Sequence, residues 1–158
     1  MGDKSESAEQ VIRRYADTVY RLAYARTGSK ADADDVFQEV FLRYIRRKPE
    51  LDDDEHLKAW FIRVTVNCCK SLALSYWNKH TEGLSDNLIF DSTGEYDLYY
   101  ELQRLRPKER EVIHLYYYED MSTGTIARTL GISEAAVRTR LARARRSLKA
   151  FMKEEDYV

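Results

Sequence analysis

The chain has 158 residues with a formal net charge of −1, and its 44% hydrophobic content is that of a globular protein of one medium-sized or two small domains. No apolar run is long enough to span a membrane, and the first ten residues, MGDKSESAEQ, are too polar for a signal peptide. We therefore expect a cytoplasmic protein that is not inserted in a membrane.

Two amphipathic helices are predicted before Pro49. The first ends near Thr27–Gly28, and the second begins at Ser29 or Asp32 and is stopped by Pro49. The first helix buries the stripe Val11, Ile12, Tyr15, Val19, Leu22 and Ala23. The second has the apolar face Val36, Phe37, Val40, Phe41, Tyr44 and Ile45. Its other face carries a compact acidic and polar patch made of Asp35, Gln38, Glu39 and Leu42.

An acidic loop separates the second helix from a third, which runs for about six turns. The apolar positions of the third helix are Leu57, Trp60, Phe61, Val64, Cys68, Leu72 and Tyr76. The three helices make a first domain over residues 1–80.

Residues 81–97 lack a helical period and form the predicted linker. From Thr81 to Glu101 the sequence has six acidic residues and no lysine or arginine. The second domain covers residues 98–158, and Pro107 suits the first turn of a helix within it. No strand signal occurs along the chain, so the predicted fold is all-α, with two small helical domains joined by an acidic linker.

Residues 122–147 predict a helix-turn-helix. Gly131 can close the tight turn in the left-handed conformation, and Ser133 is placed to cap the second helix. Gly124 lies in the first turn of the first helix, where a capping-box glutamate is missing, so we expect that helix to start late or fray. A second helix of this motif lies in the major groove of DNA.

The outer face of that second helix is basic. Between Arg128 and Lys149 there are seven basic residues and one acidic residue, which favours contacts with phosphates. Small side chains allow close approach to base edges, which arginines can then read. This face consists of Ala135, Thr139, Ala142 and Arg146, flanked by Arg138 and Arg143.

Metal, redox and catalytic sites are not expected. Cys68 and Cys69 are adjacent, and the three histidines stand at no ligand spacing, so a buried apolar role for at least one cysteine is favoured. No nucleophile–base pair or phosphate loop is present, and Asp35 and Glu39 lie on an open face. We therefore predict a protein that is not an enzyme and needs no cofactor.

The segments DADDVFQEVFLRYI, LKAWFIRVTVN, LRPKEREVIHLYYYEDMS and TIARTLGISEAAVRTRLARARRSL occur in this order along the chain. Together they resemble the extracytoplasmic-function sigma factors of bacterial RNA polymerase. The resemblance covers almost the whole chain. It implies a monomer when free, which binds core RNA polymerase and promoter DNA and is held inactive by an anti-sigma factor.

The resemblance also implies roles for individual residues. The second helix docks on a coiled-coil of the largest polymerase subunit through Asp35, Gln38, Glu39 and Leu42. The third helix reads the minus-ten element through Arg63 and Asn67, and Lys70 is placed to follow phosphates. The helix-turn-helix reads the minus-thirty-five element through Arg138, Thr139, Ala142, Arg143 and Arg146, with Arg110 near the DNA backbone.

The alternative is a stand-alone helix-turn-helix regulator with a sensory first domain. That reading predicts a dimer that binds duplex DNA tightly without polymerase. The sigma factor hypothesis predicts a monomer with weak affinity for duplex DNA, since one small DNA-binding domain buries only a limited surface area.

Overall fold

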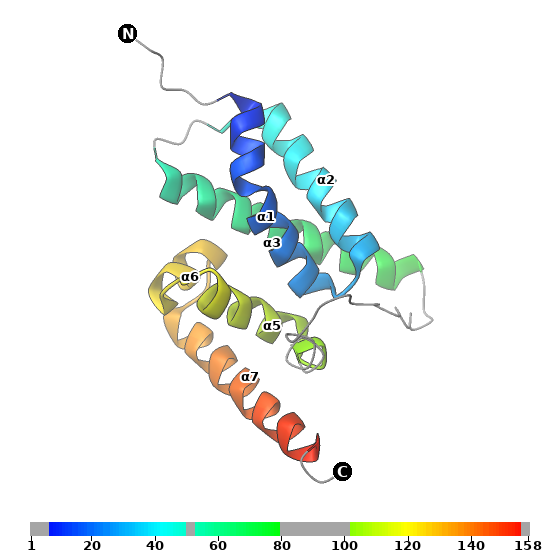
Figure 1. The fold of residues 1–158 in the computed structure, drawn as a ribbon, viewed down its shortest axis with the longest axis vertical. Helices are drawn as coiled ribbons and strands as arrows, with labels where there is room; N and C mark the ends of the chain where they lie inside the picture. The colour runs from blue at the N-terminus through cyan, green and yellow to red at the C-terminus, as the bar shows by residue number, and fades with distance from the viewer. Residues whose placement is uncertain (1–6, 50–52, 80–101, 156–158) are drawn as a thin grey trace.

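The computed structural model describes residues 7–49, 53–79 and 102–155, and all regular elements within these ranges are helical (Figure 1). The N-terminal unit consists of α1 (Ala8–Thr27), α2 (Lys30–Arg47) and α3 (Asp54–Lys79). The C-terminal unit consists of α5 (Pro107–Ile113), the π-helix η1 (His114–Tyr118), α6 (Thr123–Leu130) and α7 (Glu134–Glu155). None of the described helices is long and apolar enough to cross a membrane.

The borders of α1 and α2 lie where the sequence placed them. Gly28 ends α1 in the left-handed conformation with φ of 70°, and Ser29 then caps α2 by accepting a hydrogen bond from the Asp32 backbone. The second helix ends at Arg47, one residue before the left-handed Lys48 and two before Pro49. Caps and breakers thus fix the tight connection between the first two helices.

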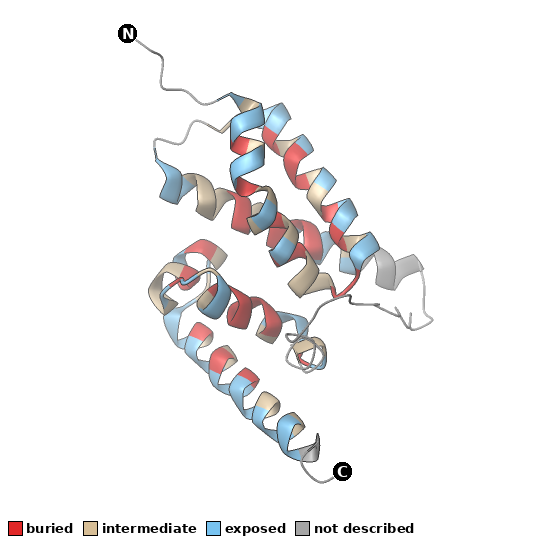
Figure 2. Ribbon diagram, viewed as in Figure 1, coloured by how far each residue is buried: buried red, intermediate tan, exposed pale blue. Residues whose placement is uncertain are grey.

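The core of the N-terminal unit is built around aromatic rings. Phe61 of α3 is fully buried, and its ring centroid lies 4.9 Å from that of Tyr15 and 5.3 Å from those of Phe41 and Tyr44. Three helices therefore meet at one side chain, and such ring pairs add to the stabilisation from buried area. Figure 2 shows the buried residues along the inner faces of these helices.

The helix-turn-helix is complete, and its first helix does not start late. Ser122 caps α6 by accepting from the Thr125 backbone, and the helix begins at Thr123. Glu134, the first residue of α7, accepts a hydrogen bond of 2.7 Å from the Thr123 hydroxyl. The Glu134 carboxylate of the next helix thus binds the N-terminal end of α6, where the capping-box glutamate is missing. The expected late start of this helix was wrong.

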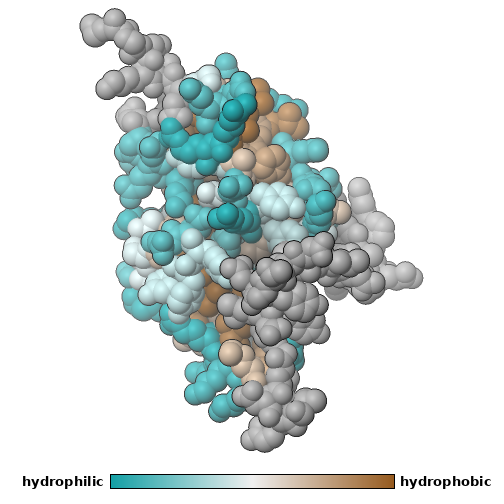
Figure 3. All heavy atoms as spheres, in the orientation of Figure 1, coloured by the Kyte–Doolittle hydropathy of each residue, from teal (hydrophilic) through white to brown (hydrophobic). Residues whose placement is uncertain are grey.

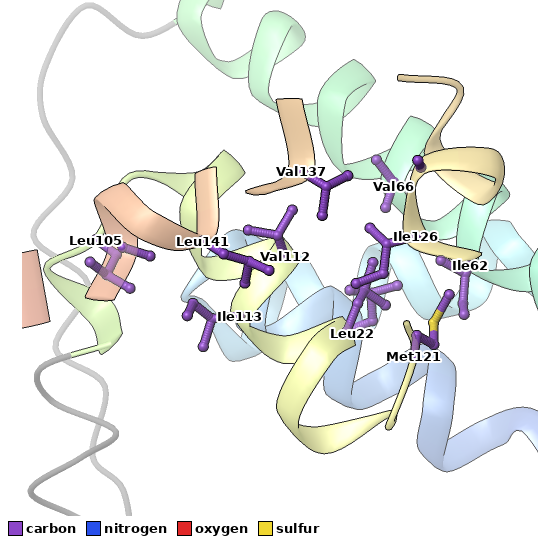
Figure 4. Close-up of a cluster of buried hydrophobic side chains, with 13 residues drawn as sticks. Leu22, Ile62, Val66, Leu105, Val112, Ile113, Met121, Ile126, Val137 and Leu141 are labelled. Atoms are coloured by element: carbon purple, nitrogen blue, oxygen red, sulfur yellow. The ribbon is translucent and has the colours of Figure 1, made fainter. Parts of the chain in front are cut away.

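The two units pack against each other through a shared apolar cluster (Figure 4). Leu22 of α1 and Ile62 and Val66 of α3 lie in one cluster with side chains of the C-terminal unit, among them Ile126 and Met121. We call this contact of the C-terminal unit with α1 and α3 the closed arrangement. The predicted linker, residues 81–97, lies outside the described residues, and the domain borders at residues 80 and 98 stay predictions.

Candidate nucleic-acid interface

The outer face of α7 is open to solvent. Ser133 caps the helix by accepting a 3.0 Å hydrogen bond from the Ala136 backbone, and Val137, Leu141 and Ala144 bury the opposite face. The side chains predicted to face DNA are all exposed: Arg138, Thr139, Ala142, Arg143 and Arg146. Of these, Arg138 forms an ion pair of 3.3 Å with Glu134 one turn earlier. Such an exposed pair is weak enough to exchange for a phosphate.

The sixth residue of the predicted minus-thirty-five set, Arg110, is buried instead. Its guanidinium donates to the backbone carbonyls of Ala25 at 2.7 Å and Arg26 at 2.8 Å, both in the last turn of α1. It also donates to the carbonyls of Leu105 at 2.8 Å and Gln103 at 3.2 Å, in the segment before α5. In the closed arrangement Arg110 is therefore bound to protein backbone and does not face solvent.

The predicted minus-ten residues form one exposed stripe on α3. Arg63, Asn67 and Lys70 follow at spacings of four and three residues, which places them on one side of the helix, and all three are exposed. Arg63 lies at the edge of the C-terminal unit, where its Nε donates a 3.2 Å hydrogen bond to the carbonyl of Thr129 in α6. The stripe thus borders the contact between the two units.

The acidic and polar patch of α2 is exposed as well. Asp35, Gln38 and Leu42 are open to solvent, while Glu39 is half-exposed and pairs with Arg43 at 3.0 Å. Ile45, which we expected on the inner face, is 47% exposed and continues the patch one turn beyond Leu42. Figure 3 shows hydrophobic atoms over α2 within a largely hydrophilic surface.

Two exposed apolar side chains near carboxylates make this α2 patch a candidate protein-docking surface. Sequence reasoning missed Ile45 because its spacing fits the inner stripe, and an apolar residue type does not itself require burial.

The molecule also contains buried ionisable side chains, among them Glu111, His114 and Cys69. Burial raises the pKa of Glu111, which Arg26 partly offsets from 3.8 Å away. Burial also lowers the pKa of His114 to about 4, with a contribution from Arg21, and raises that of Cys69 to about 12. His114 is therefore neutral and Cys69 protonated near pH 7. No group of described residues is arranged to hold a metal ion.

Two family profiles match successive parts of the chain. The profile of sigma-70 region 2 matches residues 11–79, which contain the α2 patch and the α3 stripe. The profile of sigma-70 region 4 matches residues 96–148, which contain the helix-turn-helix.

The chain is also similar to named sigma factors over most of its own length. The chain is 29% identical to the ECF RNA polymerase sigma factor SigE of Mycolicibacterium smegmatis over 92% of its own length. It is 27% identical to the ECF RNA polymerase sigma factor BldN of Streptomyces coelicolor over 96% of its length. The chain spans 62% of the length of each of these two relatives.

The arrangement of the helices is also found in a solved structure. The sigma factor RpoE of Bartonella quintana, solved in complex with the anti-sigma factor NepR, matches with a TM-score of 0.78 and 19% identity. The match covers 92% of this chain and 96% of that one, so the two share their fold across both units. The sequence, its two profile matches and its relatives show that the chain belongs to the extracytoplasmic-function sigma factors of the sigma-70 family.

Proposed function

We propose that this protein is an RNA polymerase sigma factor that binds core polymerase and directs promoter recognition, DNA opening and transcription initiation. The observation that carries the proposal is the presence of separate exposed surfaces on one chain. The basic face of α7 suits duplex DNA, the α3 stripe suits a single strand, and the α2 patch suits a protein helix. A stand-alone regulator does not require the α2 patch.

The proposed role is non-enzymatic and cytoplasmic, because RNA polymerase performs the chemistry and the factor acts where the polymerase is. We extend the proposal to an anti-sigma partner, since the Bartonella protein was solved with one. The exposed side chain of Leu42 offers such a partner an apolar contact.

In vitro transcription with core polymerase from the source bacterium tests the function. Addition of the protein to fragmented genomic DNA should produce new start sites that share two spaced upstream elements. A specific duplex-binding dimer that yields no new starts and does not bind the polymerase would instead establish the stand-alone regulator.

The docking role of α2 has a matched pair of variants. Glu39→Lys should weaken binding to core polymerase at least tenfold, because the patch then presents a cation at its centre. Glu9→Lys is the control, since Glu9 also forms an exposed ion pair with an arginine one turn later on its helix. Equal binding by the two variants would contradict the α2 site, provided that circular dichroism shows both to be folded.

A further inference from the structure

Glu134 is the only acidic residue between Arg128 and Lys149, and it is the first residue of α7, the helix with the basic face. A carboxylate at a surface that binds DNA repels phosphates and so lowers the affinity for any sequence. The helix dipole favours an acid at this end of any helix, but it does not explain which partners the side chain binds. Those partners point to a more specific role.

One oxygen of the Glu134 carboxylate contacts both helices of the helix-turn-helix. Its Oε1 accepts the 2.7 Å hydrogen bond from the hydroxyl of Thr123, the first residue of α6, and pairs with Arg138 Nη1 at 3.3 Å. Gly124 leaves space beside the carboxylate, since a Cβ added there would lie 3.9 and 4.0 Å from its two oxygens. The Arg138 guanidinium is therefore connected through Glu134 to a fixed point on the preceding helix.

Arg138 can keep this pair and still bind a base. A guanidinium has five N–H donors, and the pair with Glu134 engages Nη1. Two further donors match the two acceptors that guanine presents in the major groove. A long exposed side chain without such support would lose more conformational entropy on reaching the same geometry. The carboxylate therefore prepares Arg138 for a base contact.

The same pair disfavours a competing contact. A guanidinium at a DNA surface also binds backbone phosphates, and such a contact carries no sequence information. Exchange of Glu134 for a phosphate gives up the carboxylate contact of Arg138, and the carboxylate itself repels the phosphate. Glu134 thus favours the base contact of Arg138 over the phosphate contact.

We propose, on the basis of the promoter recognition proposed above, that Glu134 is a positioning residue that sets the sequence specificity of Arg138. In this role it touches no base and acts only through Arg138, with the Thr123 hydroxyl as its fixed partner on α6. It lowers the affinity for DNA in general and raises the ratio of affinities for correct and incorrect sequences. Such a trade is possible because specificity is a difference between two binding free energies.

Binding of the full chain to two duplexes tests this role. The probe is a short duplex that the wild-type protein enriches from a random pool, and the reference is the same duplex with its bases scrambled. Glu134→Ala should bind the reference about twofold more tightly, because a negative charge is lost, and should reduce the ratio of the two affinities about fivefold. For the reference, the slope of log affinity against log salt should steepen by about one, as Arg138 becomes free to bind a phosphate.

Glu9→Ala is the matched control. Glu9 pairs at 2.8 Å with Arg13 one turn later in α1, so this variant loses the same charge and the same kind of pair on the other unit. It should leave the affinity ratio unchanged. Thr123→Val keeps every charge but removes the fixed partner of Glu134, and should lower the ratio about twofold without a change in the salt slope. Thermal melts check that each variant is folded.

Arg138→Ala, alone and combined with Glu134→Ala, shows whether Glu134 acts through Arg138. The double variant should have the same affinity ratio as Arg138→Ala, because Glu134 then has no guanidinium to position. A further fall of the ratio in the double variant would mean that Glu134 contacts a base itself and would overturn the positioning role. Equal loss of affinity for both duplexes in Glu134→Ala would also overturn it, since that result indicates a structural role alone.

Failure of this inference and failure of the sigma factor function are distinguishable. If the wild type initiates transcription but Glu134→Ala keeps the wild-type affinity ratio, the positioning role is refuted and the function stands. If the ratio falls as expected but no form initiates transcription with core polymerase, the sigma factor function is refuted and Glu134 serves a stand-alone regulator. A wild-type protein that enriches no sequence, with or without core polymerase, would overturn the positioning role.

Discussion

The long helix α7 and the short helix α5 both carry arginines that the resemblance to sigma factors assigns to promoter DNA, but their environments are opposite. Arg143 of α7 is exposed, whereas Arg110 of α5 is buried against the last turn of α1. The difference arises from backbone carbonyls that lack a helical partner and lie within reach of Arg110. An arginine matched to a DNA contact can thus be bound by backbone carbonyls of the protein itself.

The largest expected effect is on stability at Arg110. Arg110→Ala removes a buried guanidinium that donates four hydrogen bonds to carbonyls, which should lower the free energy of unfolding by about 4 kcal/mol. Arg143→Ala, on the exposed face, should change it by less than about 0.5 kcal/mol. Urea denaturation of the two variants measures their free energies of unfolding. Equal losses of stability in both variants would contradict the expected difference.

The second effect is on the pH dependence of stability. The pKa of His114 is lowered from 6.5 to about 4 by burial, so as the pH falls the unfolded chain takes up the proton first. Stability should therefore be fully present above pH 6.5 and decline by about 3 kcal/mol as the pH falls to 4.

His114→Phe retains the ring that stacks on Tyr118 and should make this decline shallower. Melting temperatures of both proteins at several pH values provide the test. Parallel pH profiles would show that His114 does not titrate in this way.

The third effect is on DNA affinity. Here the exposed arginines of α7, whose loss should hardly change stability, are expected to matter. Arg138→Ala and Arg143→Ala should each weaken binding to a minus-thirty-five duplex by about 1–3 kcal/mol, the value of a bidentate base contact. Arg13→Ala is the control, because Arg13 is an exposed helical arginine on the other unit. Fluorescence anisotropy at fixed salt measures all three, and control-like affinity in both α7 variants would exclude the assigned reading face.

The smallest effect compares the two glycines of the helix-turn-helix. Gly124 is helical, and an added Cβ would meet only side-chain atoms at 3.7 Å or more, so Gly124→Ala should stabilise the protein by about 1 kcal/mol. Gly131 has φ of 70°, so Gly131→Ala should destabilise it by about 1 kcal/mol, although no atom lies within 4 Å of its Cβ position. Thermal melts that shift in the same direction for both would contradict this difference.

Local signals in the sequence were enough to place most helices. The stripe from Val11 to Ala23, the glycines at 28 and 131 and Pro107 each act within a turn or two of the chain, and the structure confirms them. The exposed face of α7 followed from the same periodicity. These features depend on neighbours in sequence, which is why sequence reasoning reached them.

Features that depend on distant segments were not reached. Arg110 is buried against carbonyls that lie more than eighty residues earlier in the chain. The regular start of α6 depends on Glu134, which lies beyond the turn that follows this helix. Ile45 fits an inner stripe by spacing, but in the folded unit its side chain is 47% exposed while that of the neighbouring Tyr44 is buried. The relative placement of the two units is likewise a property of tertiary packing, and no periodicity or motif within either unit predicts it.

The capping of α1 by Arg110 has a consequence for where the folding units end. A fragment that stops near residue 80 would leave the carbonyls of Ala25 and Arg26 without their donor and expose Leu22, Ile62 and Val66 to water. The predicted linker therefore does not separate the closed molecule into two independent folding units. Truncation at that point should cost the first helix its last turn, and the melting of the two halves should be cooperative only in the intact chain.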